Sequence, residues 1–163
     1  MSELFHTSVK GVLIRDERIL LVQYDEDGVG IHYNLPGGRQ HKDETVHEAL
    51  KRKMMEEAGA DVIPGPFLFL YEFIGKNHDY FDGAKHSVSM VFKCTLRPGS
   101  VPSMATCTKP QIGEGLKIVQ TDVTWLPLKD FGKVLFWPTV QDKIVALHQR
   151  TDASDDRYLG DIL

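Results

Sequence analysis

The sequence has few cysteines and no long apolar run, and both absences limit what the protein can be. Cys94 and Cys107 are its only two cysteines, and they form neither a Cys-x-x-Cys pair nor the set expected of a disulfide framework. A reducing compartment is therefore expected. No apolar stretch approaches the roughly 18 residues of a membrane span, and residues 1–10 contain no apolar region of a secretory signal. We expect a cytoplasmic protein that does not enter membranes.

An excess of positive charge is also missing. The formal net charge is −4, and the 19 Lys and Arg residues are scattered along the chain. Because nucleic-acid backbones are bound by clustered basic residues, a nucleic-acid polymer is not expected as a partner. The chain has 163 residues, 42% hydrophobic and 26% charged, which fits one globular domain. A phosphorylated ligand would need the help of a cation.

Short β-rich segments fill most of the chain, and only two segments have helical periodicity. Thr45 and Glu48 have the spacing of a capping box, so a helix is expected from Thr45 to Ala58. A second amphipathic helix is expected from Pro138 to about Arg150. Strands are expected over residues 7–14, 18–23, 32–35, 67–74, 87–95 and 117–126.

Two loops and the C-terminal tail are unusual in length or composition. Residues 75–86 and 97–115 are longer than ordinary turns, and the second loop is expected either to face a ligand or to be locally disordered. The tail, residues 151–163, is acidic and then apolar. We expect it to dock on the domain of residues 1–150 or on a second subunit, so a homodimer is possible.

The first expected helix carries charged residues where a buried face is predicted. At about 100° per residue, Lys53 and Glu57 fall inside the apolar stripe, and Arg52 and Glu56 lie on its edge. Charged groups at the edge of a core need partners. The residues that define the stripe are Val46, Ala49, Leu50 and Met54.

One interpretation of these charges is a metal site. Glu56 and Glu57, together with Glu44 just before the helix, would supply the hard oxygen ligands that Mg²⁺ prefers. The preceding glycines, Gly37 and Gly38, favour this interpretation, because a helix that is merely salt-bridged does not require a glycine loop before it.

The other interpretation is a satisfied network of salt bridges. In that network Lys53 pairs with Glu57, Glu48 pairs with Arg52, and Arg52 also pairs with Glu56. Pairs spaced by four residues lie next to each other on a helix, so the spacing alone allows this network. The charge pattern by itself does not choose between the two interpretations.

The run from Gly38 to Ala60 resembles the signature of the Nudix hydrolase family, the Nudix box. The signature requires Gly, five residues, Glu, seven residues, Arg-Glu, an aliphatic residue, any residue, Glu-Glu, any residue, Gly and an aliphatic residue. Lys53 stands where the family has the Glu after the Arg. The strands before the box, the strand at Trp125 and the closing helix extend the resemblance over about residues 7–150. The matching positions are Gly38, Glu44, Arg52, Glu56, Glu57 and Gly59.

This resemblance implies a fold and a reaction. The implied fold is α/β, a Nudix α/β/α sandwich with a mixed β-sheet between helices, formed by residues 1–150. The implied reaction is that of a pyrophosphohydrolase, which uses Mg²⁺ or Mn²⁺ to hydrolyse a phosphoanhydride bond in a nucleoside diphosphate linked to another moiety. Small nucleotides, dinucleoside polyphosphates and nucleotide sugars all remain open as the small-molecule partner.

The resemblance also implies site residues. Glu56 and Glu57 would bind the metal, and Arg52 would orient a glutamate by a salt bridge. Glu44 in the box and Glu114 in the long loop are further catalytic candidates, since loop glutamates supply a base or ligand in some relatives. The box glycines and one strand residue are expected to contact the substrate: Gly37, Gly38 and His86. Side chains outside the box that can stack on a base or bind a phosphate are Tyr24, His32, Tyr33, Tyr71, Phe73, His78, Tyr80 and His86.

Lys53 bears on whether the family reaction is possible. A protonated lysine cannot ligate Mg²⁺, and it competes with the metal for Glu56 and Glu57. Another glutamate would have to take over, such as Glu114, or Lys53 would have to contact phosphate directly. The alternative function is a Nudix-fold nucleotide-binding or sensor protein with weakened catalysis. A third is a module that binds a partner through its tail.

Overall fold

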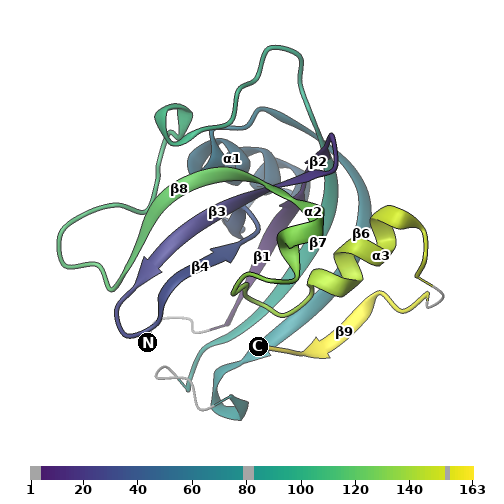
Figure 1. The fold of residues 1–163 in the computed structure, drawn as a ribbon. Coiled ribbons are helices and arrows are strands. Elements are labelled where there is room, and N and C mark those ends of the chain that lie inside the picture. Colours follow the sequence, from purple (N-terminus) through teal and green to yellow (C-terminus); the bar gives the residue numbers. More distant parts are fainter. Residues whose placement is uncertain (1–4, 79–82, 153–154) are drawn as a thin grey trace.

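Two β-sheets form the centre of the molecule in the computed structural model, which describes residues 5–78, 83–152 and 155–163 (Figure 1). The first sheet has the strand order β5-β1-β7-β6-β9, and the second joins β2, β3 and β4, with β8 paired to β3. The strands are β1 (Phe5–Val12), β2 (Ile14–Arg15), β3 (Arg18–Glu26), β4 (Gly30–Asn34), β5 (Gly37–Arg39), β6 (Val62–Ile74), β7 (His86–Leu96), β8 (Ile118–Pro127) and β9 (Tyr158–Asp161).

The first sheet mixes parallel and antiparallel pairs. β1 runs parallel to β7, with Phe5 opposite His86 and Val12 opposite Lys93. β1 is antiparallel to β5 on its other side, and β6 is antiparallel to β7. The expectation of a mixed sheet is therefore confirmed.

The helix of the box, α1 (Val46–Ala58), forms as predicted. The Thr45 hydroxyl accepts a hydrogen bond from the Glu48 amide at 3.1 Å, and the Glu48 carboxylate accepts one from the Thr45 amide at 2.8 Å. Gly59 ends the helix in the left-handed conformation, with φ of 62°, which glycine adopts without steric cost. Local sequence signals thus set both ends of α1.

The remaining helices differ in part from expectation. α3 (Gln141–Gln149) begins three residues after Pro138, and α2 (Leu128–Phe131) was not predicted, since it is a single turn. Two 3-10 turns, η1 (Gly75–Asn77) and η2 (Met104–Thr106), lie in the two long loops. The described part of the chain contains no helix with the length and apolar composition to cross a membrane.

Helices cover the sheets from two sides, which confirms the predicted sandwich architecture. On one side, Leu50 and Met54 of α1 pack against β1, β3, β6 and β7 in one hydrophobic cluster. On the other side, Phe131 of α2 and Ile144 of α3 belong to a second cluster. Figure 1 shows α1 and α3 on different sides of the strands. The sheets therefore contribute to both clusters.

Two strands lie where no strand was expected. Gly37 and Gly38, predicted to be in a loop, belong to β5 and pair with Lys10 and Val9 of β1. The tail contributes β9, which runs parallel to β6 of the same chain, with Leu70 opposite Tyr158. Both strands are short, with three and four residues. Their pairing is set by distant parts of the chain, so periodicity does not reveal them.

Candidate functional site

The first part of the site is the contact between β5 and the C-terminal half of α1. The amide of Gly37 donates a hydrogen bond to Oε2 of Glu57 at 3.2 Å. Gly37 has a φ of 150°, and a Cβ atom there would lie 2.0 Å from the carbonyl oxygen of Val9. No side chain fits at Gly37, because β5 runs so close to β1 there. The backbone amide of Gly37 is the group that reaches Glu57.

Arg52 holds two glutamates in place. Its Nε and NH2 atoms donate to both oxygens of Glu44, at 3.1 and 2.6 Å, and NH1 donates to Glu56 at 3.2 Å. NH2 also donates to the carbonyl of Arg39 at 2.9 Å. These bonds from Arg52 lower the pKa of Glu44 to about 2. These hydrogen bonds are the kind of contact that the orienting role predicted for Arg52 requires.

The hydrogen bonds between Arg52 and Glu44 lead to a prediction about stability and its dependence on pH. Glu44→Gln is expected to lower the free energy of unfolding by about 1 to 2 kcal/mol near pH 7, because it weakens charge-assisted hydrogen bonds. A depressed pKa stabilises the fold above the ordinary carboxyl pKa of 4.5 and loses this effect as the pH falls toward 2. Urea unfolding at several pH values should therefore show the difference between wild type and variant shrinking from pH 5 to pH 2.

A matched control for this prediction is Asp43→Asn. Asp43 pairs with Lys42 at 2.7 Å, but the two side chains are 80% and 89% exposed. An exposed pair of this kind is expected to contribute less than about 0.5 kcal/mol. An equal loss in both variants, or a difference that does not depend on pH, would contradict the role assigned to Arg52 and Glu44.

Lys53 lies between Glu56 and Glu57. Its Nζ is 3.1 Å from an oxygen of Glu56 and 3.1 Å from an oxygen of Glu57. All three side chains are largely buried, with exposed fractions of 17%, 16% and 12%. The stem of Lys53 lies against Gly38, where a Cβ atom would be 2.4 Å from Cε of the lysine. Gly38, the first residue of the box, therefore makes room for the lysine.

The predicted network of salt bridges is present with one correction. The pairs Lys53–Glu57 and Arg52–Glu56 form. Glu48 does not pair with Arg52, because its carboxylate caps the helix at Thr45. The spacing of four residues allowed a pair that the capping box then replaced.

The positions of Glu56 and Glu57 fit a divalent cation. Both carboxylates approach one point, which the ammonium of Lys53 now takes. Mg²⁺ typically binds through one or two carboxylates and completes its shell with water and substrate oxygens. Within the described residues no group of three or more His, Cys, Asp or Glu side chains is arranged to hold a metal. The two glutamates would therefore hold the ion, and Lys53 would have to leave its place.

A cavity of about 270 Å³ opens at these charges. The long loop closes one side of it, because the amides of Thr108 and Lys109 donate to the carbonyls of Met55 and Glu56 at 3.3 and 3.0 Å. Glu114 is exposed and is not part of the cavity lining. Its catalytic role stays a prediction. The cavity is lined by Arg39, His41, Arg52, Lys53, Glu56, Glu57, Lys109, Pro110 and Gln111.

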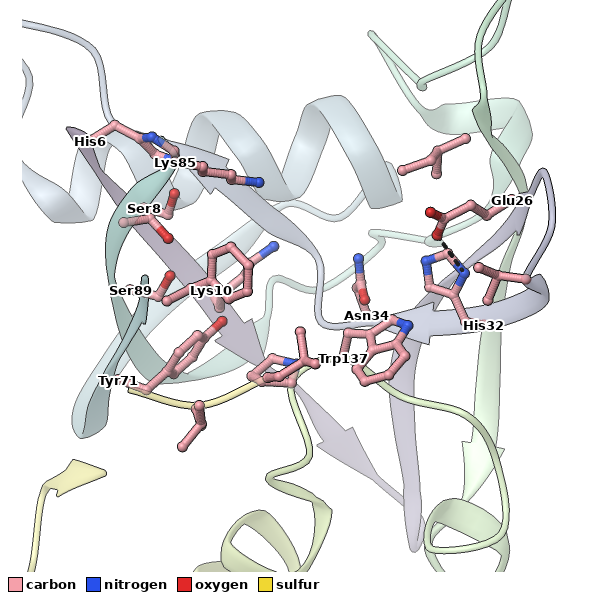
Figure 2. Close-up of a pocket in the computed structure, with 17 residues that line it drawn as sticks. His6, Ser8, Lys10, Glu26, His32, Asn34, Tyr71, Lys85, Ser89 and Trp137 are labelled. Carbon is pink, nitrogen blue, oxygen red and sulfur yellow. Dashed lines mark ion pairs between the residues drawn. The ribbon is translucent and has the colours of Figure 1, made fainter. Parts of the chain in front are cut away.

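A larger cavity of about 430 Å³ lies between the two sheets. Figure 2 shows His6, Ser8 and Lys85 on one side of it, and Glu26, His32 and Trp137 on the other. The lining combines cationic, polar and apolar side chains: His6, Ser8, Lys10, Glu26, Val29, His32, Asn34, Tyr71, Phe73, Lys85, Ser87, Ser89, Ile118, Trp137, Pro138, Ile162 and Leu163.

Lys10 connects this cavity to the box. Its side chain lines the cavity, and Nζ donates to the carbonyl of Leu35 at 3.5 Å. Burial lowers the pKa of Lys10, the negative charge of Glu57 raises it, and the positive charge of Lys53 lowers it. Lys10 also lies opposite Gly37 in the pairing of β1 with β5, and the amide of Gly37 donates to Glu57 at 3.2 Å. A ligand that fills the large cavity can therefore extend past Lys10 toward α1.

Two histidines face the cavity with unused hydrogen-bonding atoms. Nδ1 of His32 has no hydrogen-bond partner, and its distance of 3.6 Å to Glu26 is too long for a hydrogen bond, although an ion pair forms if the ring is protonated. The ring stacks on Tyr24 at 5.6 Å. Nδ1 of His6 also has no partner, and burial is the main cause that lowers the pKa of His6 to about 4. Both nitrogens are buried, although the two rings line the cavity.

The substrate residues expected from the sequence are only partly gathered here. His32, Tyr71 and Phe73 line the large cavity. His86 lies beside the cavity lining and pairs with Glu72 at 3.0 Å. Tyr80 lies outside the described residues. The ring of Tyr24 stacks on His32, and the Tyr33 hydroxyl donates a hydrogen bond to the side chain of Gln23. His78 pairs with Asp161.

Sequence reasoning missed several lining residues, of which Lys10 and Trp137 are the most informative. Lys10 stands between Val9 and Val12, two buried apolar positions of β1, so a charged residue among core positions was the available signal. Trp137 follows the buried Phe136 in a segment without periodicity. It had no such signal, because its place in the cavity depends on tertiary contacts.

Comparisons with known proteins agree with this architecture. The family model described as NUDIX domain matches residues 4–148. No curated protein matches. Among solved structures, a NUDIX hydrolase from Nitrosomonas europaea has 19% sequence identity and a TM-score of 0.63, and covers 94% of this chain and 91% of its own.

Two further solved structures have the same fold at low identity. A MutT NUDIX hydrolase from Burkholderia pseudomallei has 22% identity, a TM-score of 0.61, and coverage of 89% of this chain and 97% of its own. An ADP-ribose pyrophosphatase from Streptococcus suis has 16% identity, a TM-score of 0.59, and coverage of 96% and 98%. At these identities the structural likeness shows the fold.

Proposed function

Because this chain belongs to the Nudix family, we propose that it hydrolyses a phosphoanhydride bond in a nucleoside diphosphate linked to another moiety. The observation that carries the proposal is the convergence of the Glu56 and Glu57 carboxylates on one cation position, close to a cavity of about 430 Å³. The nucleoside would occupy the large cavity, and the diphosphate would extend past Lys10 toward α1.

The residues of the box and their neighbours would have distinct roles in this reaction. Glu56 and Glu57 would hold Mg²⁺ or Mn²⁺, which when bound neutralises charge on phosphoryl oxygens and activates water. Arg52 would keep Glu44 and Glu56 in position through its hydrogen bonds. The Gly37 amide would orient Glu57. Lys10, which lies opposite Gly37 in the pairing of β1 with β5, would donate hydrogen bonds to the phosphates.

The test is turnover of a substrate panel. Wild-type protein should release phosphate or nucleotide from at least one nucleoside triphosphate, nucleotide sugar, ADP-ribose or dinucleoside polyphosphate in the presence of Mg²⁺ or Mn²⁺. A chelator should abolish the release. No turnover of any compound with either ion would refute the proposal.

A specific observation supports a second function, nucleotide binding without turnover. The ammonium of Lys53 contacts both carboxylates, so a metal has to displace a buried ion pair before it binds. If that displacement does not occur, the cavity still offers side chains for a nucleotide. Binding of a nucleotide to the wild type without turnover would favour this second function.

A further inference from the structure

The C-terminal tail forms part of the wall of the large cavity. Ile162 and Leu163 line it, together with Trp137 and Pro138. Ile162 and Leu163 belong to the tail, which lies beyond residue 148, where the match to the family model ends. The tail therefore contributes a part of the wall that the matched family model does not include.

The tail is held on both sides of the cavity. The amide of Ile162 donates to the carbonyl of Glu72 in β6 at 2.9 Å. The carbonyl of Leu163 accepts hydrogen bonds from the amide and hydroxyl of Thr139, at 3.3 and 3.0 Å. Residues 162–163 therefore connect the first sheet to the segment that carries Trp137.

Side chains of β9 fix the tail along β6. The Asp161 carboxylate accepts hydrogen bonds from the amide of Ile74 and the side chain of Asn77, both at 2.8 Å, and contacts Nε2 of His78 at 2.7 Å. The Tyr158 hydroxyl donates to Glu72 at 2.6 Å. These contacts specify where the tail lies, so the position of Ile162 is set by the fold.

The lining of the cavity contains both apolar side chains and a lysine that lies beside the box. Trp137, Pro138, Ile162 and Leu163 offer apolar surface. Lys10 offers an amine donor and lies opposite Gly37, whose amide bonds Glu57 of the box. A ligand with a flat, weakly polar part and an anionic part matches this arrangement, with its anionic part directed toward α1. A nucleoside diphosphate has both parts.

We propose that Ile162 and Leu163 contact the nucleoside part of a nucleoside diphosphate ligand, so that the tail determines the affinity and the size of the accepted nucleoside. This inference rests on the proposed function for its class of ligand. It differs from a role of the tail in subunit contact, because the residues in question face the cavity.

The test compares two tail residues of equal size. Ile162 and Leu159 are isomers, and both pack against the same hydrophobic cluster, but only Ile162 lines the cavity. Dissociation constants for ADP, GDP, CDP and UDP are measured by titration calorimetry for wild type, Ile162→Ala, Leu159→Ala and Ile162→Trp, with melting temperatures and oligomeric states measured alongside.

The expected result separates binding from packing. For the nucleotide that binds best, Ile162→Trp should weaken binding at least tenfold, because the larger ring occupies ligand space. Ile162→Ala should weaken it about threefold to tenfold, and Leu159→Ala should leave it within twofold. The two alanine variants should lower the melting temperature to a similar extent. If Ile162→Trp does not fold, the two alanine variants decide.

Several outcomes would overturn the inference. One is wild-type affinity in Ile162→Trp and Ile162→Ala; another is equal weakening by Leu159→Ala and Ile162→Ala. A changed oligomeric state with unchanged affinity would show that the tail is a subunit contact. If none of the four nucleotides binds to wild type, the ligand is not a nucleoside diphosphate. Binding that depends on Ile162 without hydrolysis of any substrate would leave this inference standing while refuting the hydrolase proposal.

Discussion

Replacing Lys53 with Glu is expected to raise the affinity of the protein for Mn²⁺ at least tenfold. The change removes the ammonium that contacts Glu56 and Glu57 and adds a third carboxylate beside them. Two unit charges about 4 Å apart at an effective dielectric constant of about 20 interact by about 4 kcal/mol, and about a third of that energy is a tenfold change. Electron paramagnetic resonance of free Mn²⁺ measures the affinity directly.

The matched control is Lys51→Glu. It makes the same change of charge on the same helix, but Lys51 is exposed and does not contact the cavity. Its effect on Mn²⁺ affinity should stay within about threefold, since solvent screens exposed charges. Equal affinities of the two variants would contradict the competition between Lys53 and the metal.

A comparison of wild type with Lys53→Glu separates the two candidate functions. If wild type hydrolyses a compound of the panel, the hydrolase proposal stands, and the missing carboxylate is dispensable. If only Lys53→Glu hydrolyses it, the wild-type protein binds its nucleotide without turnover. The measurement is the rate of phosphate or nucleotide release at saturating Mg²⁺.

Replacing Glu57 with Gln is expected to lower the rate of hydrolysis at least 100-fold. Glu57 would hold the metal, and its charge balances the ammonium of Lys53. Gln is nearly isosteric with Glu but is a much weaker ligand for a hard cation, and loss of a metal ligand or of an acid–base group typically costs 100-fold or more. Initial rates on the best substrate of the panel give the size of the effect.

Glu48→Gln is the control for this prediction. Glu48 lies on the same helix, but its carboxylate caps Thr45 and it is not part of the lining of either cavity described above. Its rate should stay within about twofold of wild type, since Gln also serves as the third helical residue of a capping box. If Glu57→Gln and Glu48→Gln have equal rates of hydrolysis, Glu57 does not have the role in catalysis proposed for it.

Local signals explain why the box helix was predictable. The capping box of Thr45 and Glu48 and the terminal Gly59 act within a few residues of each helix end. The contacts of Lys53 with Glu56 and Glu57 follow from spacings of three and four residues on that helix. The error at Glu48 has a local cause as well, because a carboxylate at the third helical position can reach either the cap or the next turn.

Residues brought together from distant segments were not predictable. The large cavity takes Lys10 from β1, Trp137 from the segment before α3, and Ile162 from the tail. β9 has only four residues and includes Gly160 at a φ of 79°, so it lacks the alternation that identifies a strand. Its position depends on parallel pairing with β6, which the sequence pattern does not encode.

The parallel pairing of β1 with β7 has a consequence for the order of folding. Residues 5–12 pair with residues 86–93 by backbone hydrogen bonds. During synthesis β1 therefore leaves the ribosome well before its partner strand β7. Such non-local parallel pairing is intrinsically slow to form. β9 joins β6 later still along the chain. A nascent chain that stops before residue 158 therefore already contains the glutamates of α1 but lacks the segment that closes the cavity.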